Sequence, residues 1–204
     1  MRITIGAHKG GVGKTTSAVM LAWLLARDGT PTILIDADSR SGSATTWWDL
    51  AIKHGETWPE KMTLQRPDEW RDPLTLPPPE LSHVVVDVGP GDLGRLHAAA
   101  ALSDLAVMCT SPLPLDVATV GAAVADIERT GCPLVGVLLT QVHGGTVEAR
   151  EVPGELREDD VPALDTVVPW SVPRYGRAAG TVPTDYSAGV YAAVLAELQT
   201  PVEA

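Results

Sequence analysis

A glycine-rich loop near the start of the chain constrains its fold more than any other feature. It runs from Gly6 to Thr16 and reads Gly-Ala-His-Lys-Gly-Gly-Val-Gly-Lys-Thr-Thr, between a short apolar strand and an amphipathic helical pattern. Glycines let a backbone wrap closely around phosphate oxygens, and the N–H groups that begin the following helix donate to them. Lys14 adds a positive charge, the Thr15 hydroxyl is placed for a magnesium ion, and Thr16 lies near the α-phosphate. The loop predicts a nucleotide phosphate site at the end of a buried strand.

The rest of the chain alternates short apolar runs with helical patterns. The runs are almost continuously apolar, as is typical of strands buried on both faces of a parallel sheet. They cover residues 3–5, 32–35, 84–86, 105–108, 134–139 and 166–168. Helices are expected after the loop, where Ala18, Leu21, Ala22 and Leu25 share one face, and over about 43–54, 93–102, 116–129, 146–158 and 185–199. This order predicts a doubly wound α/β fold, a mostly parallel sheet with helices on both faces, in one domain over residues 1–204.

A proline-rich segment over residues 55–80 interrupts the alternation. We expect a surface excursion there, with a short edge strand at Met62–Leu64. Four tryptophans cluster around it, namely Trp47, Trp48, Trp58 and Trp70. They either cover the edge of the core or offer aromatic surface to bases or a partner, and we expect the first.

Composition limits the classes of function. The chain has 204 residues and a formal net charge of -11, so any contact with DNA must come from a local basic patch. Cys109 and Cys132 lie in apolar stretches without the spacing of a metal site, and we expect buried, reduced thiols. The first residues lack the pattern of a signal peptide, and no apolar run approaches the ~20 residues of a membrane span. These observations predict a cytoplasmic protein.

The loop departs from the ordinary Walker A motif because His8 stands where that motif requires a glycine, six residues before Lys14. It matches K-G-G-x-G-K-T-T instead, with an additional lysine at position 9. In this the chain resembles the deviant Walker A ATPases, the family of ParA and MinD. The resemblance implies that Lys9 crosses a dimer interface to phosphate in the partner's site, so that ATP binding and homodimer formation are one event. Taken alone, Lys9 could also be a solvated loop lysine.

Two later motifs extend the resemblance. Residues 33–38 form an apolar strand that ends in Asp-Ala-Asp, and residues 83–91 read His-Val-Val-Val-Asp-Val-Gly-Pro-Gly. By resemblance Asp38 positions the attacking water, Asp36 lies nearer the magnesium shell, and Asp87 holds magnesium through water. Gly89 and Gly91 then form the switch that senses the γ-phosphate. Carboxylates at the carboxyl ends of parallel strands face the phosphate crevice, which agrees with these roles.

The resemblance assigns a full set of site residues. The expected cofactors are ATP or ADP with Mg²⁺, and the expected activity is slow ATP hydrolysis stimulated by a partner. The expected catalytic residues are Lys9, Lys14 and Asp38, and the metal-binding residues are Thr15, Asp36 and Asp87. The nucleotide-binding residues are Lys9, Gly10, Gly11, Val12, Gly13, Lys14, Thr15, Thr16 and Pro169.

Further segments specify the branch of the family. Residues 110–116, with Pro114 and Asp116, resemble the loop and helix start after the fourth ParA strand, and residues 168–186 resemble the segment that closes over adenine. The chain begins directly at the loop strand, as small plasmid ParA and ParF proteins do, and it ends without a basic membrane-binding helix. Ser39-Arg40 replaces the usual Pro-Gln, which leaves the hydrolysis rate open.

The resulting functional hypothesis is an ATPase that partitions plasmid or chromosomal DNA. ATP-bound dimers would bind nonspecific DNA, associate with the nucleoid, and be released when a centromere-binding ParB-type partner stimulates hydrolysis. The candidate DNA contacts are Arg150, Arg157, Arg174 and Arg177, each of which could equally be a solvated surface residue. The alternative is an ATP-switched dimer that docks on a protein partner without DNA, and the acidic composition and Ser39-Arg40 favour it slightly.

Overall fold

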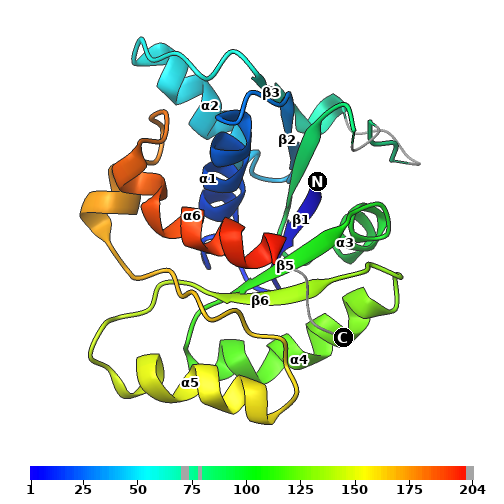
Figure 1. Cartoon of the computed structure of the whole chain (residues 1–204), viewed down its shortest axis with the longest axis vertical. Coiled ribbons are helices and arrows are strands. Elements are labelled where there is room, and N and C mark those ends of the chain that lie inside the picture. Colours follow the sequence, from blue (N-terminus) through cyan, green and yellow to red (C-terminus); the bar gives the residue numbers. More distant parts are fainter. Residues whose placement is uncertain (70–73, 78–79, 201–204) are drawn as a thin grey trace.

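The computed structural model describes residues 1–69, 74–77 and 80–200. Its centre is a six-stranded sheet with the order β3-β2-β4-β1-β5-β6, in which every pairing is parallel (Figure 1). The strands are β1 (Arg2–Gly6), β2 (Thr32–Ala37), β3 (Met62–Gln65), β4 (His83–Val88), β5 (Leu105–Thr110) and β6 (Val135–Leu139). The predicted α/β fold with a parallel sheet is confirmed. Since β1 lies between β4 and β5, the glycine-rich loop emerges at the centre of the sheet.

Three helices cover each face of the sheet (Figure 1). One face packs against α1 (Lys14–Ala26), α2 (Ser43–Lys53) and α6 (Asp185–Gln199), and the other against α3 (Leu93–Ala100), α4 (Pro114–Glu128) and α5 (Val147–Glu158). The expectation of an amphipathic helix after the loop is wrong, because α1 has no exposed residue. Helix α6 packs against α1, so the side of α1 turned away from the sheet is covered too.

The predicted strand at residues 166–168 is also wrong. This segment runs beside the edge strand β6, but its backbone bonds occur at separated points: Leu164 N–H donates to Val137 and Val168 N–H donates to Leu139. Between these two bonds the segment advances by four residues while β6 advances by two, and this mismatch prevents a continuous ladder of backbone hydrogen bonds. The short edge strand expected at Met62–Leu64 is confirmed, as β3.

The tryptophans around the proline-rich segment cover the core, as expected for those the structure describes. Trp47 and Trp58 are buried, and the rings of Trp48 and Trp58 stack with their centroids 4.3 Å apart. Trp70 lies outside the described residues.

Two further expectations concerned buried cysteine thiols and the absence of a membrane-spanning segment. Cys109 and Cys132 are free and buried, as predicted. Within the described ranges, none of the helices combines the length and apolar character needed to cross a bilayer.

Candidate functional site

Two adjoining cavities lie at the carboxyl ends of the central strands. The larger, of about 520 Å³, is lined by the glycine-rich loop, by the start of α1 and by Asp38. The smaller, of about 270 Å³, lies beside it and is mostly apolar. Both cavities are bounded by Gly13, Thr16, Gln141 and Ala179. A phosphate chain in the first and a base in the second would account for one continuous nucleotide site.

The glycine-rich loop has the backbone geometry that a phosphate cradle needs. Gly11 and Gly13 both adopt φ of 81°, a left-handed conformation that favours glycine. Gly13 is the N-cap of α1, so the residues that carry the first free N–H groups of that helix are among those that line the cavity. Lys14 lines the cavity and its side chain is largely buried. Of the loop residues predicted to bind the nucleotide, this cavity is lined by Gly10, Gly11, Gly13, Lys14, Thr15 and Thr16.

Two residues after β6 support this loop, and the sequence analysis missed them. The Thr140 hydroxyl donates to the carbonyl of Val12 at 2.7 Å, and the Gln141 amide donates to the carbonyl of Gly11. Val12 itself has a buried side chain, so it takes part through its backbone. Gln141 holds φ of 57°, which is uncommon for a residue other than glycine. The available signal was their place directly after a buried parallel strand, where ligand-facing residues gather.

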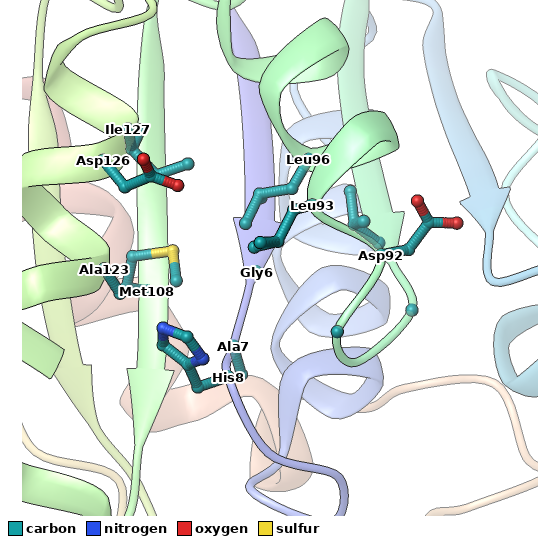
Figure 2. Close-up of a pocket in the computed structure, with 13 residues that line it drawn as sticks. Gly6, Ala7, His8, Asp92, Leu93, Leu96, Met108, Ala123, Asp126 and Ile127 are labelled. Carbon is teal, nitrogen blue, oxygen red and sulfur yellow. The ribbon is translucent and has the colours of Figure 1, made fainter. Parts of the chain in front are cut away.

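His8 does not obstruct the phosphate cavity. It lines a separate crevice of about 10 Å³ beside the end of β1, where Figure 2 shows it next to Ala7. Gly6 borders the same crevice, and a Cβ added there would lie 2.6 Å from Leu96. A side chain at this position would therefore make the Leu96 side chain of α3 shift. The crevice is too small for a nucleotide.

Two of the three residues expected around magnesium, Thr15 and Asp87, contact each other, and one oxygen of Asp87 has no hydrogen-bond partner among the described residues. The Thr15 hydroxyl donates to Asp87 Oδ2 at 2.7 Å, while Asp87 Oδ1 is buried and has no hydrogen-bond partner among the described residues. Burial raises the pKa of Asp87 to about 7, although the Thr15 hydroxyl and the charge of Lys14 oppose the shift. A free carboxylate oxygen beside a threonine hydroxyl fits a hydrated Mg²⁺. No cluster of three or more His, Cys, Asp or Glu side chains in the described part of the chain could hold a metal alone, so phosphate oxygens would complete the shell.

The two carboxylates at the end of β2 have different surroundings. Asp36 is fully buried, and its oxygens accept the N–H groups of Asp38 at 3.0 Å and Thr45 at 2.8 Å. It does not line either cavity, so its role at the metal stays a prediction. Asp38 lines the phosphate cavity.

Asp38 is held by the loop that follows it. Its Oδ1 accepts the N–H groups of Arg40 and Ser41, and its Oδ2 accepts the Ser41 hydroxyl at 2.5 Å. Burial opposes ionisation, but these bonds and the charge of Lys14 outweigh it and hold the pKa of Asp38 below its usual value. The carboxylate is therefore ionised at neutral pH and can accept a hydrogen bond. Of the unusual Ser39-Arg40 pair, Arg40 contributes to this arrangement through its backbone N–H.

Lys9 lies outside the cavity formed by its own loop. Its ammonium group pairs with Asp116 Oδ1 at 2.9 Å, and the Ser111 hydroxyl donates to the other oxygen of Asp116 at 2.6 Å. Burial tends to raise the pKa of Asp116, but both contacts lower it further than burial raises it. The Lys9 side chain is 60% exposed, and it does not line either nucleotide cavity. Lys9 thus lies outside the nucleotide cavities of its own chain, and its contact across a dimer stays a prediction.

The smaller cavity has aromatic and apolar walls. Pro169, which was predicted to bind the nucleotide, lines it together with Trp170, Tyr175 and Tyr191, which were not assigned from the sequence. Tyr175 and Tyr191 meet edge to face with centroids 6.0 Å apart. The Tyr191 hydroxyl contacts Ser17 at 3.2 Å beneath the phosphate loop. Such walls suit a flat heterocycle, because aromatic faces stack on bases.

The four arginines proposed for DNA do not form one patch of free charge. Arg157 pairs with Asp165, and the Arg174 guanidinium lies 4.7 Å from the ring centroid of Tyr186. Arg150 and Arg177 are exposed. The segment 147–160, which contains α5, carries two arginines and six carboxylates, so its surroundings repel a phosphate backbone.

Comparison with known proteins agrees with this site. The profile of the CobQ/CobB/MinD/ParA nucleotide binding domain matches residues 3–178. The chain is 35% identical over 165 residues to the Maintenance of carboxysome distribution protein A of Gloeobacter kilaueensis, covering 78% of this chain and 72% of that protein.

Two solved structures share the fold at low sequence identity. A Borrelia burgdorferi protein assigned to plasmid partition and bound to AMPPNP superposes with a TM-score of 0.74 at 18% identity, covering 97% of this chain and 98% of that chain. The septum site-determining protein MinD of Pyrococcus horikoshii with Mg-ADP gives 0.68 at 20% identity, covering 98% and 99%.

Proposed function

Because the chain belongs to the CobQ/CobB/MinD/ParA nucleotide-binding family, we propose that it is an ATPase that dimerises on ATP and positions a cargo. The observation that carries the proposal is the place of Lys9. It follows the phosphate-binding strand directly, yet it lies outside its own cavity and is more than half exposed. A second copy of the chain facing this surface would offer a phosphate for that ammonium group.

The residues of one chain have distinct roles in this proposal. The loop N–H groups and Lys14 bind the phosphates and offset their charge. Asp38 orients the attacking water and accepts its hydrogen bond, since its carboxylate is ionised and lines the phosphate cavity. Thr15 and Asp87 would hold Mg²⁺, which supplies charge compensation at the phosphates when it is bound. The apolar cavity beside Pro169 would hold adenine.

The cargo is proposed to be DNA or a body carried over DNA. One relative is named for carboxysome distribution and one structural neighbour for plasmid partition, and these names support a positioning task here. Arg174 lies in the turn η2 (Val172–Gly176) and Arg177 directly follows it, in a segment of the chain separate from the acidic helix α5. We therefore place nonspecific DNA contacts there in preference to Arg150 and Arg157. A ParB-type partner would stimulate hydrolysis.

A second function is favoured by one observation. The formal net charge of -11 and the acidic α5 leave little basic surface, which suits a dimer that docks on a protein partner without DNA. Both functions predict slow turnover, so the hydrolysis rate does not separate them.

Retention of nonspecific duplex DNA at physiological salt separates the two functions. We would compare ATP, ADP, and the Asp38→Ala variant with ATP, the variant being expected to keep the ATP dimer. Retention only in the ATP states, weakened by Arg177→Ala and not by Arg150→Ala, supports the DNA function. Absence of retention in every state, with ATP dimerisation intact, identifies the protein-docking switch.

Dimerisation is tested separately by light scattering. Lys9→Ala is expected to bind ATP but remain monomeric, Lys14→Ala to lose nucleotide binding, and Lys61→Ala, an exposed lysine far from the loop in sequence, to behave as wild type. Normal ATP-dependent dimerisation of Lys9→Ala would show that the proposed contact across the dimer is wrong.

A further inference from the structure

The loop that closes one side of both cavities has no regular structure of its own. Residues 178–182 follow the turn η2, and Ala179 borders both the phosphate cavity and the base cavity. Gly180 lines the phosphate cavity next to it. The shape of the nucleotide site therefore depends on what holds this loop in place.

Side chains from α2 and the turn after it hold the loop at three successive residues. The Trp47 indole donates to the carbonyl of Thr181 at 2.7 Å, and His54 Nδ1 contacts the carbonyl of Gly180 at 3.1 Å. A carbonyl only accepts, so His54 carries its proton on Nδ1 in this contact. Glu56 accepts the N–H of Val182. We call Trp47, His54 and Glu56 the α2 clamp.

Packing between the clamp contacts brings the helix and the loop together closely. A Cβ added at Gly180 would lie 3.1 Å from Leu50, and Gly180 adopts φ of 82°. Trp47, Leu50 and His54 are spaced i, i+3 and i+7, so they share one face of α2. This face of the helix meets the loop, and its Trp47 and Leu50 also line the phosphate cavity.

The opposite end of α2 is bound to the carboxylate of Asp36 and to the backbone of Asp38. Thr45 in its first turn donates its N–H to Asp36, and the Gly42 N–H, one residue before the helix, donates to the carbonyl of Asp38. The helix has 11 residues and so spans about 16 Å. It connects the residue proposed to orient water with the loop that bounds the base cavity.

We propose that Trp47 is a positioning residue, which through α2 makes the placement of Asp38 depend on the loop 178–182. This proposal rests on the proposed ATPase function and adds a coupling between the phosphate cavity and the base cavity. Nucleotide held against the loop stabilises α2, and α2 fixes the loop that carries Asp38. Loss of the indole donor uncouples the two ends.

The test uses Trp47→Phe with Trp58→Phe as a matched control. Each change keeps an aromatic ring and removes one indole N–H that donates to a backbone carbonyl, but Trp58 donates to Trp48 and not to the loop. We expect Trp47→Phe to raise KM for ATP about fivefold and to lower kcat at saturating ATP at least threefold. Trp58→Phe should change each less than twofold. A raised KM with unchanged kcat would overturn the coupling, as would equal effects in both variants.

His54→Ala provides a variant that should fold normally, because its side chain is exposed. Its effects should follow those of Trp47→Phe in direction, and His54→Gln, which restores an N–H donor, should recover at least part of the loss. Failure of both expectations would refute a role for the clamp.

Amide hydrogen exchange of the nucleotide-free protein tests the coupling without any turnover. Trp47→Phe should speed exchange in residues 178–182 and also in residues 38–46, whereas Trp58→Phe should not. Faster exchange in the first segment alone would overturn the proposal. A wild-type protein that neither binds nor hydrolyses ATP would refute the proposed function, and the exchange result would still decide whether α2 links the two segments.

Discussion

Replacing Gly89 with alanine should disturb Asp38 directly. Gly89 follows β4, and a Cβ added there would lie 2.8 Å from Asp38 Oδ1 and 3.3 Å from its Cα. The φ of Gly89 is not among the left-handed values, so the backbone accepts alanine and the clash alone decides the outcome. A carbon–oxygen contact needs more than 3 Å, so the carboxylate must move by several tenths of an ångström.

The magnitude follows from the bonds that hold the carboxylate. Asp38 accepts two backbone N–H groups and the Ser41 hydroxyl, and movement away from Gly89 weakens at least one of them. A hydrogen bond to a charged group contributes about 1.5–3 kcal/mol, so we expect a loss of about 2–3 kcal/mol in the free energy of unfolding. For a chain of this size that lowers Tm by about 5–10 °C. Displacement of the water-orienting group should reduce kcat about tenfold.

Thermal unfolding and steady-state hydrolysis would be measured with Gly94→Ala as the control. A Cβ at Gly94 would meet only Asp92, at 3.8 Å, and the residue lies within α3, so alanine there should be neutral or stabilising by roughly 0.5–1 kcal/mol. In an Asp38→Ala background, Gly89→Ala should cost less than 1 kcal/mol, because its clashing partner is gone. The same cost in both backgrounds would refute the reasoning.

Three further changes test other contacts of the site. Asp87→Asn should flatten the pH dependence of the free energy of unfolding in the nucleotide-free protein. Because the pKa of Asp87 is raised, the wild-type free energy of unfolding should fall by up to ~1.4 kcal/mol per pH unit as pH rises from about 4 to 7. If urea unfolding gave the same dependence on pH for the variant and the wild type, the prediction would be wrong. Asp116→Asn should free Lys9 and tighten ATP-dependent dimerisation about threefold, because the partly exposed Lys9–Asp116 ion pair contributes less than about 1 kcal/mol. Sedimentation measures the dimer affinity, and weaker dimerisation would show that Asp116 aids the contact. Tyr191→Phe should cost about 1 kcal/mol in urea unfolding because Ser17 loses one partner, and a loss above about 3 kcal/mol would point to repacking instead.

Much of the candidate site could be predicted from the sequence because its parts are local. The turn through Gly11 and Gly13, the helix start at Lys14 and the hydroxyl of Thr15 lie within five consecutive positions, and residue type there fixes backbone geometry. Asp87 was expected from the resemblance of its motif to that of the family, and its place near the end of a buried parallel strand agrees with that expectation. The parallel sheet itself followed from strands that are apolar on both faces.

Tertiary structure decided which distant residues meet. Lys9 pairs with a residue 107 positions away, and Trp47 binds a carbonyl 134 positions away. Neither pairing leaves a periodic or compositional trace, because a side-chain contact between separate segments depends on how their elements pack. The same cause explains residues 166–168, whose apolar β-branched sequence favours a strand but whose register against β6 forbids a ladder. The residues of the phosphate loop could therefore be predicted from the sequence, while the contacts that couple one part of the site to another depend on the tertiary structure.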